Sequence, residues 1–195
     1  MTNHLVLVGG HEGTGKSEFA RDLARITHIA LIDWDTVTGP LAHALAEQRC
    51  TDPSDTRSDP YLRHIRPLRY QCLMGTATEI LDSGSSVIAA APFLDEVTNP
   101  EWLATTELRC HEANADLHIV WVRSDLASVH KRLAWRNADR DAWKLANWDE
   151  YVKRVNEQQV PVGPFALVNN AAGAAKTLAE QALELAGVLL GEDYT

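Results

Sequence analysis

Eight consecutive residues near the N-terminus have the types and the spacing needed to hold phosphate. The run Gly-His-Glu-Gly-Thr-Gly-Lys-Ser fits the pattern G-x-x-x-x-G-K-[ST]. Its glycines let successive backbone N–H groups turn inward and form an anion-binding concavity at a helix start. In this pattern the Lys16 ammonium reaches the β- and γ-phosphates, and the Ser17 hydroxyl binds Mg²⁺. The segment predicts a nucleoside triphosphate site made by Gly10, His11, Glu12, Gly13, Thr14, Gly15, Lys16 and Ser17.

Two aspartates follow the second apolar run of the chain. The sequence Ile32-Asp33-Trp34-Asp35 reads as the end of a strand, where alternation puts Asp33 and Asp35 on one side. The carboxyl ends of parallel strands form the edge at which ligands bind. There we expect Asp33 to help hold Mg²⁺ and Asp35 to accept the proton of an attacking hydroxyl. The alternative is that either aspartate caps the next helix.

The third apolar run lacks the acidic residue that motor ATPases place after it. Val87-Ile88-Ala89-Ala90-Ala91 continues into Pro92-Phe93, and the next acid is Asp95. This argues against motor ATPases and ABC-type proteins and fits a small kinase whose metal needs only the loop hydroxyl and Asp33. Phe93, in the turn, is assigned to the acceptor site.

Cations recur every four residues in the segment that follows the fourth apolar run. They predict a slowly turning stripe on one long helix, where arginine could neutralise charge on a transferring phosphoryl group. The bland alternative is a solvated charged face. The stripe consists of Arg132, Arg136, Arg140 and Lys144.

A second basic cluster lies in the segment 61–70. Arg63, Arg66 and Arg69 are spaced to share a helix face, although Pro67 kinks or starts that helix. We expect this basic face, with Arg63 and Arg66 as its acceptor-binding residues, to grip an acidic or polyhydroxylated acceptor opposite Asp35. Surface pairing with the preceding Asp-rich loop is the alternative. The histidines show no spacing such as H-x-x-x-H, so no structural zinc site is expected.

The elements that must position these residues alternate along the chain. Strands are expected at 4–8, 29–32, 86–90, 117–122 and 166–168. Helices are expected at 16–26, 37–47, 61–82, 102–114, 125–156 and 174–190. This order predicts an α/β protein: a three-layer α/β/α fold with a five-stranded parallel sheet, in one domain spanning 1–195. The segments near 50–70 and 125–156 are expected to form the acceptor site and a helical lid.

Composition excludes several functional classes. The chain has 195 residues, of which 45% are hydrophobic and 23% charged, and its net charge is −9. An acidic surface argues against non-specific binding to DNA or to an anionic membrane. The three cysteines have no C-x-x-C spacing, and neither a signal peptide nor a membrane span is evident. A cytoplasmic monomer or homodimer is expected.

Together the phosphate loop, the aspartate pair and the basic segment resemble small P-loop kinases. The resemblance is to the group of shikimate and gluconate kinases, chloramphenicol phosphotransferase and zeta-toxin-like enzymes, and polynucleotide kinases, built on an AAA-type ATP-binding domain. It implies that Asp35 contacts the acceptor hydroxyl as base and that Asp33 lies on the metal side.

The same resemblance assigns residues of the lid. The segment Arg132-Leu133-Ala134-Trp135-Arg136 is similar to the group's R-x-x-x-R at the start of the lid. This implies that Arg132 lies over the adenine or near the phosphates, with Arg136 at the transferring phosphoryl group. Arg140-Asp141 resembles a further R-D of the phosphotransferase branch. Asn169 and Asn170 fall where such kinases line the adenine pocket with loop backbone.

The expected activity is transfer of the γ-phosphoryl group of ATP, with Mg²⁺, to a hydroxyl of a small molecule. Sugar-like, antibiotic-like and other metabolite acceptors are all open. A nucleoside or nucleotide kinase and a toxin-type nucleotide-sugar kinase remain alternatives. A regulatory module that binds ATP without turnover is the alternative from another class.

Overall fold

A computed structural model describes residues 2–49, 52, 56 and 58–191. Five parallel strands form one sheet in the order β2-β3-β1-β4-β5. The strands are β1 (Asn3–Gly9), β2 (Ala30–Asp33), β3 (Val87–Ala90), β4 (Ala115–Arg123) and β5 (Ala166–Asn169). The expected five-stranded parallel sheet is therefore confirmed.

The position of each strand in the sheet follows from its composition. β1 lies in the centre, and its apolar run from Leu5 to Val8 is buried on both faces. Such continuous burial is typical of an interior strand in a parallel sheet that is covered by helices on both sides. β2 and β5 lie at the edges, and each keeps exposed or half-buried positions.

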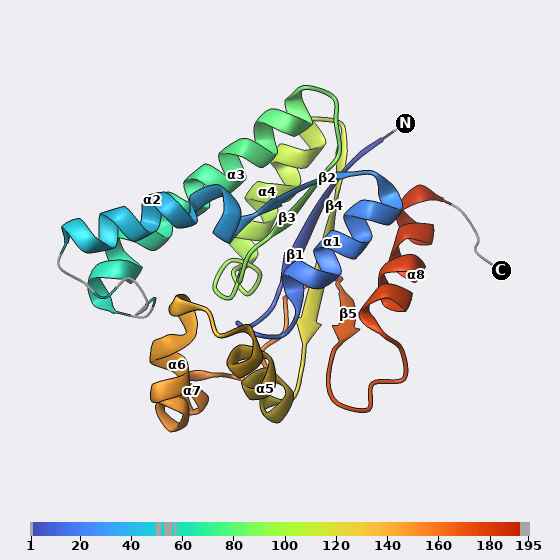
Figure 1. The fold of residues 1–195 in the computed structure, drawn as a ribbon. Coiled ribbons are helices and arrows are strands. Elements are labelled where there is room, and N and C mark those ends of the chain that lie inside the picture. The colour runs from blue at the N-terminus through green and yellow to red at the C-terminus, as the bar shows by residue number, and fades with distance from the viewer. Residues whose placement is uncertain (1, 50–51, 53–55, 57, 192–195) are drawn as a thin grey trace.

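Helices cover both faces of the sheet and complete three layers (Figure 1). Their bounds are α1 (Lys16–Thr27), α2 (Trp34–Gln48), α3 (Arg66–Asp82), α4 (Pro100–Glu112), α5 (Leu126–Arg136), α6 (Ala142–Ala146), α7 (Trp148–Arg154) and α8 (Leu178–Leu190). A π-helical turn, Tyr61–Ile65, leads into α3, and a 3-10 turn, Asp139–Asp141, precedes α6.

Two apolar clusters fill the space between the layers. On one face, Val6 and Val8 pack with Phe19 and Leu23 of α1 and with small residues of α8. On the other face, Leu5 and Leu7 pack in a cluster that includes residues of α3 and α4. The alternation of β1 side chains between these clusters holds the strand, and the loop that follows it, in a fixed place.

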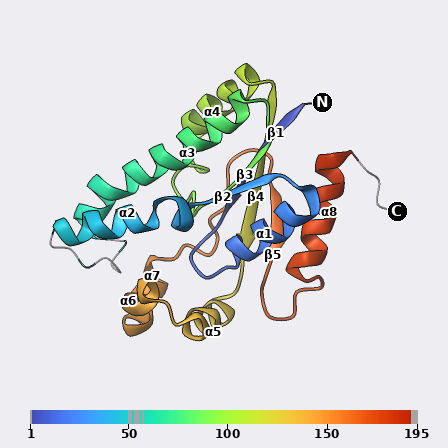
Figure 2. The ribbon, with the colours of Figure 1, turned by 45° about the horizontal axis from the view of Figure 1, so that its top comes forward.

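The expected long helix over 125–156 is wrong. Asp125 caps α5 by accepting a hydrogen bond from the Ser128 backbone N–H at 2.8 Å. The helix ends after Arg136 because Asn137 adopts a left-handed conformation with φ 45°. The 3-10 turn, α6 and α7 follow as separate short pieces. We call residues 126–154 the lid segment, and Figure 2 shows its helices grouped together at one end of the molecule.

Smaller corrections concern where helices begin. The last helix starts at Leu178 instead of 174, because Thr177 and Glu180 form a reciprocal capping box.

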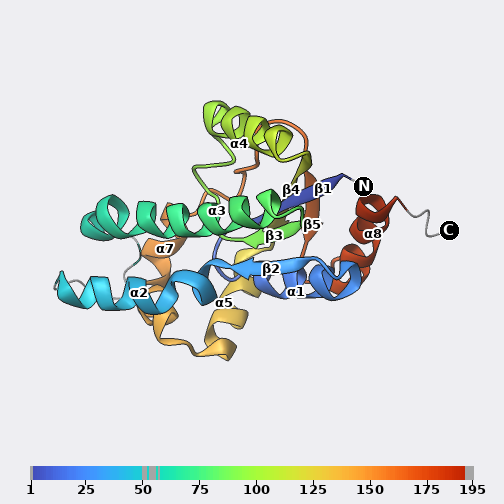
Figure 3. The ribbon, with the colours of Figure 1, turned by 90° about the horizontal axis from the view of Figure 1, so that it is seen from above.

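α2 and α3 run side by side and project beyond β2 (Figure 3). Among the described residues, no helix has both the length and the apolar character needed to cross a bilayer. The Asp-rich loop expected before residue 61 lies partly outside the described residues.

Candidate functional site

The phosphate loop joins the carboxyl end of β1 to α1 and has the backbone that its glycines allow. Gly10 has φ 138°, and a Cβ there would lie 2.2 Å from the Val122 carbonyl oxygen. Gly15 has φ 100° and precedes α1, where a Cβ would lie 2.3 Å from Asn170 Nδ2. Both positions require glycine on conformational and steric grounds. The loop is a curved turn at a helix N-terminus, as its anion-binding role demands.

Lys16 lies in the first turn of α1, with its side chain folded over the loop. Its ammonium donates a hydrogen bond to the His11 carbonyl oxygen at 2.8 Å. Burial lowers the pKa of Lys16 to about 8, although Glu12, Asp35 and Asp33 each oppose this change. A triphosphate placed here would supply the negative charge that this desolvated ammonium needs.

Ser17 and Asp33 meet beside the loop. The Ser17 hydroxyl donates to Asp33 Oδ2 at 2.6 Å, and both residues line the same cavity. A hydroxyl and a carboxylate are hard oxygen ligands of the kind that Mg²⁺ prefers. The pair therefore fits the metal role predicted for it.

The predicted extension of the second strand through Asp35 is wrong. β2 ends at Asp33, whose Oδ1 accepts hydrogen bonds from the backbone N–H of Asp35 at 2.9 Å and of Thr36 at 3.3 Å. This capping starts α2 at Trp34, three residues before the expected position. The capping alternative thus holds for Asp33, and Asp35 lies in the first helical turn instead of on a strand.

Arg69, to which the sequence assigned no site role of its own, holds Asp35 in place. Its Nη2 lies 3.1 Å from Asp35 Oδ1, and its guanidinium lies 4.0 Å from the centre of the Trp34 ring. Two further hydrogen bonds, to Thr38 Oγ1 at 2.7 Å and to Tyr61 Oη at 2.6 Å, occupy other donors. Because Arg69 is buried, these contacts fix the direction of the Asp35 carboxylate.

The other residues assigned to the acceptor divide into two groups. Arg66 lines the cavity and pairs with Asp95 at 3.1 Å and Glu96 at 2.9 Å. Arg63 does not line it: its side chain is exposed and pairs with Asp59 at 3.3 Å, as the surface alternative supposed. Arg63 lies in the π-helical turn at 61–65, whereas Arg66 is the first residue of α3. The two arginines therefore do not follow one regular helical spacing. Phe93 is fully buried between Tyr70 and Trp102, so its assignment to the acceptor is also wrong.

Arg132 connects the lid segment to the phosphate loop. Its Nε donates to the Gly13 carbonyl oxygen at 2.8 Å, and its Nη1 donates to the Asn170 carbonyl oxygen at 3.1 Å. Asn170 also donates from Nδ2 to the Thr14 carbonyl oxygen at 2.8 Å. Asn169, which with Asn170 was assigned to the adenine pocket, ends β5 and bonds to Gln181 of α8. Its neighbour is the residue that contacts the loop.

The predicted stripe of cations on one helix is wrong, because the helix ends at Arg136. Arg136 nevertheless lines the cavity, and its Nη2 pairs with Asp141 Oδ2 at 2.6 Å. Lys144, from α6, approaches the other oxygen of Asp141 at 3.5 Å. Asp141 is fully buried, and its two ion pairs connect the end of α5 to α6. The side chain of Arg140 lies outside the described residues.

Two further contacts fasten the loop to the lid segment and to the residues that follow it. His11 Nε2 lies 3.1 Å from the Asn156 carbonyl oxygen, and the Tyr151 hydroxyl donates to the Glu12 carbonyl oxygen at 3.3 Å. The His11 side chain thus faces the region after α7, while its carbonyl faces Lys16. Thr14 is buried and donates its hydroxyl to the His11 carbonyl oxygen at 2.9 Å.

A cavity of about 740 Å³ brings most of these residues together. One side is formed by the loop and Arg132, and the opposite side by Asp35, Tyr61, Arg66 and Arg69. The volume lies in the range of small-molecule sites, so it can hold a nucleotide and part of a second ligand. The sequence-predicted residues that line it are Glu12, Gly13, Gly15, Lys16, Ser17, Asp33, Asp35, Arg66, Arg132 and Arg136.

Comparisons with known proteins show to which family and fold the chain is similar. An AAA domain family model matches residues 5–158. The APS kinase CysC of Mycobacterium tuberculosis, solved in complex with AMPPNP and APS, is 20% identical with a TM-score of 0.62, covering 97% of this chain and 98% of that one. A sugar kinase from Janibacter sp. HTCC2649 is 16% identical with a TM-score of 0.58, over 99% and 96% of the two chains.

A gluconokinase from Sinorhizobium meliloti 1021 is 17% identical with a TM-score of 0.53, over 99% and 98% of the two chains. A search of curated proteins found no match. At these identities the likeness shows the fold, which is that of the P-loop kinases, as the sequence predicted.

Proposed function

The chain belongs to the AAA domain family, and on that premise we propose that it is an ATP-dependent phosphotransferase. It would move the γ-phosphoryl group of ATP, with Mg²⁺, to a hydroxyl of a small-molecule acceptor. One observation carries the proposal: a single cavity joins the Lys16 phosphate loop to a carboxylate, Asp35, which a buried arginine orients. A module that only binds nucleotide has no need of that second group.

Each end of the cavity has a task in this reaction. At the loop, backbone N–H groups and Lys16 hold the phosphates, while Arg132 and Arg136 border the same space from the lid segment. At the other end, Asp35 accepts the proton of the acceptor hydroxyl. The hydroxyl oxygen forms the new bond to phosphorus, and the bond from phosphorus to the β–γ bridging oxygen breaks, which leaves ADP.

Ser17 and Asp33 would hold the magnesium ion. When bound there, Mg²⁺ would supply positive charge that offsets the negative charge of the phosphates. The chain's own contribution is to place a hydroxyl and a carboxylate within 2.6 Å of each other at the loop.

The acceptor side favours a small polar compound. Arg66, Arg69, Asp35 and the Tyr61 hydroxyl surround it with groups that can exchange hydrogen bonds with hydroxyls. The neighbours solved as sugar kinase, gluconokinase and APS kinase support a polyhydroxylated acceptor. Because one neighbour was solved with APS bound, a nucleotide acceptor is the second candidate.

The test is an ATP-consumption assay screened over sugars, sugar acids, nucleosides, nucleotides and hydroxylated antibiotics. We expect one class to stimulate ADP release. In Asp35→Asn the stimulated rate should fall about 100-fold or more, because the proton acceptor is lost, while ATP binding changes little. Lys16→Ala should abolish both the acceptor-stimulated rate and ATP binding.

Asp82→Asn is the matched control, since Asp82 is exposed on α3 and pairs with Arg109. It should leave the stimulated rate unchanged. Full acceptor-dependent turnover in Asp35→Asn would show that Asp35 is not the base. ATP binding without stimulation by any class would favour the regulatory module instead.

A further inference from the structure

Three side chains with metal-binding atoms meet at the edge of the sheet opposite the phosphate loop. His4 lies near the amino end of β1, whereas the loop follows the carboxyl end of that strand. Asp116 and His118 lie near the amino end of β4. Their ligand atoms all fall within 4.8 Å of one another. None of these residues lines the large cavity.

The strand register explains how residues so distant in sequence converge. β1 and β4 are parallel neighbours, with His4 opposite Asp116 and Val6 opposite His118. Side chains at alternate positions of a strand share a face, so all three residues project on the side of Val6. That side is the one covered by α1 and α8. The grouping therefore results from the paired backbones and not from chance contacts of surface side chains.

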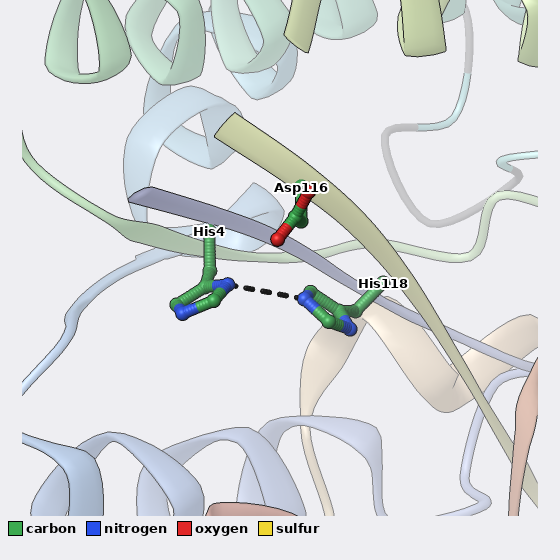
Figure 4. A group of neighbouring side chains, drawn as sticks. All are labelled: His4, Asp116 and His118. Atoms are coloured by element: carbon green, nitrogen blue, oxygen red, sulfur yellow. Dashed lines mark hydrogen bonds between the residues drawn. The ribbon is translucent and has the colours of Figure 1, made fainter. Parts of the chain in front are cut away.

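The two imidazoles are already close to a chelating arrangement. His4 Nδ1 lies 3.1 Å from His118 Nε2, and Figure 4 shows the two nitrogens facing each other with Asp116 beside them. Two nitrogens bound to one tetrahedral Zn²⁺ at its usual bond length are separated by about 3.3 Å. An ion could replace the hydrogen bond between the rings with little movement of either.

The charge and the support of these side chains favour binding. Asp116 is exposed and supplies the negative charge that compensates a divalent ion. The backbone N–H of His4 donates to Ser86 Oγ at 3.0 Å, which fixes the start of the strand.

We infer that His4, Asp116 and His118 form a Zn²⁺ site, with water as the fourth ligand. Two imidazoles and a carboxylate suit Zn²⁺ and disfavour Mg²⁺, which prefers oxygen ligands alone. This is contrary to the expectation from sequence that no structural zinc would be found. Lying far from the cavity, the ion would join two strands whose ligands are 114 residues apart in sequence.

The experiment titrates Zn²⁺ into untagged, chelator-treated full-length chain by calorimetry, with Mg²⁺ in excess to occupy the oxygen sites. We expect one equivalent to bind. His4→Gln and His118→Gln should each weaken binding by about tenfold or more, because each removes a ligand. His111→Gln and Cys72→Ser are matched controls: both side chains are exposed and lie outside the cluster, so binding should not change.

A second measurement needs no variant and so does not depend on folding. In the wild-type chain, Zn²⁺ should shift the imidazole NMR signals of two of the eight histidines, and the melting temperature should rise. Absence of stoichiometric binding, or equal binding by His118→Gln and wild type, would overturn the proposal. Neither readout depends on kinase activity, so the two proposals fail independently.

Discussion

Lys16 combines two roles that depend on its charge: it holds the loop through the His11 carbonyl, and it is placed to meet phosphate. Burial lowers its pKa to about 8 from 10.5. Above that pH the free chain increasingly carries a neutral Lys16, whereas a bound triphosphate requires the charged form. The charge that matters for binding is thus lost within an accessible pH range.

We therefore predict that ATP affinity falls as pH rises through about 8, at most about tenfold per pH unit, since one proton is involved. The measurement is calorimetry between about pH 7.5 and 9.5. Lys16→Arg, which stays charged, should lose this pH dependence even if it binds more weakly. Lys176→Met is the control: Lys176 is exposed and lies just before α8, so this variant should keep the pH dependence. A slope retained in Lys16→Arg would mean that another group titrates.

Arg69 and Arg63 provide a contrast between a buried and an exposed arginine. Arg69→Met removes the partner of Asp35 and leaves the Tyr61 and Thr38 hydroxyls without their charged donor. We predict a loss of about 2 kcal/mol in the free energy of unfolding, allowing for the partial exposure of Asp35. Arg63→Met removes only an exposed pair and should cost less than about 1 kcal/mol.

Chemical denaturation of both variants measures the difference. The conservative variant Arg69→Lys separates stability from positioning: we expect it to fold and to lower the acceptor-stimulated rate, because an ammonium cannot make the same set of contacts. Equal stability of the Arg69 and Arg63 variants would contradict the role given to the buried guanidinium.

At the scale of elements, the lid segment depends on one buried carboxylate. Asp141 receives Arg136 from α5 and Lys144 from α6. Breaking a buried ion pair by removing one partner leaves charge without compensation. The short helices α6 and α7 would have little intrinsic stability once this link is lost.

Asp141→Asn should therefore destabilise the lid segment by about 2 kcal/mol, since Asp141 and Lys144 are buried but the Arg136 side chain is 37% exposed. Hydrogen exchange should show faster exchange of amides over residues 137–147, while β1 and β4 stay protected. Asp139→Asn, an exposed neighbour in the same turn, is the control and should exchange like wild type. Unchanged protection in Asp141→Asn would contradict the structural role of these two ion pairs.

The elements also show what local patterns can predict. The phosphate loop and the five strands were identifiable because their signals are contiguous: a fixed motif and apolar runs. Helix boundaries failed where one side chain decides them. Asp33 started α2 early, Asn137 ended α5, and Thr177 with Glu180 delayed α8. Each of these residues has several common roles, and only the surrounding backbone selects one of them.

At the scale of the whole molecule, the missed residues are those brought together by the fold. The sequence placed Arg69 on a basic face opposite Asp35, but the direct pair forms only because α2 and α3 run side by side, which no pattern within α3 indicates. The His4, Asp116 and His118 grouping depends on the pairing of β1 with β4. The D-x-H spacing at 116–118 was visible, but nothing local connects it to His4.

Asp33 has one consequence for how the two ends of the cavity communicate. Its two oxygens serve different partners: Oδ2 faces Ser17, and Oδ1 holds the start of the helix that carries Asp35. Oδ1 can keep its hydrogen bonds from the backbone of α2 while Oδ2 changes its partner. We therefore expect nucleotide binding at one end to leave the acceptor end undisturbed. Asparagine at this position would preserve those hydrogen bonds and lose the charge, whereas alanine would remove both.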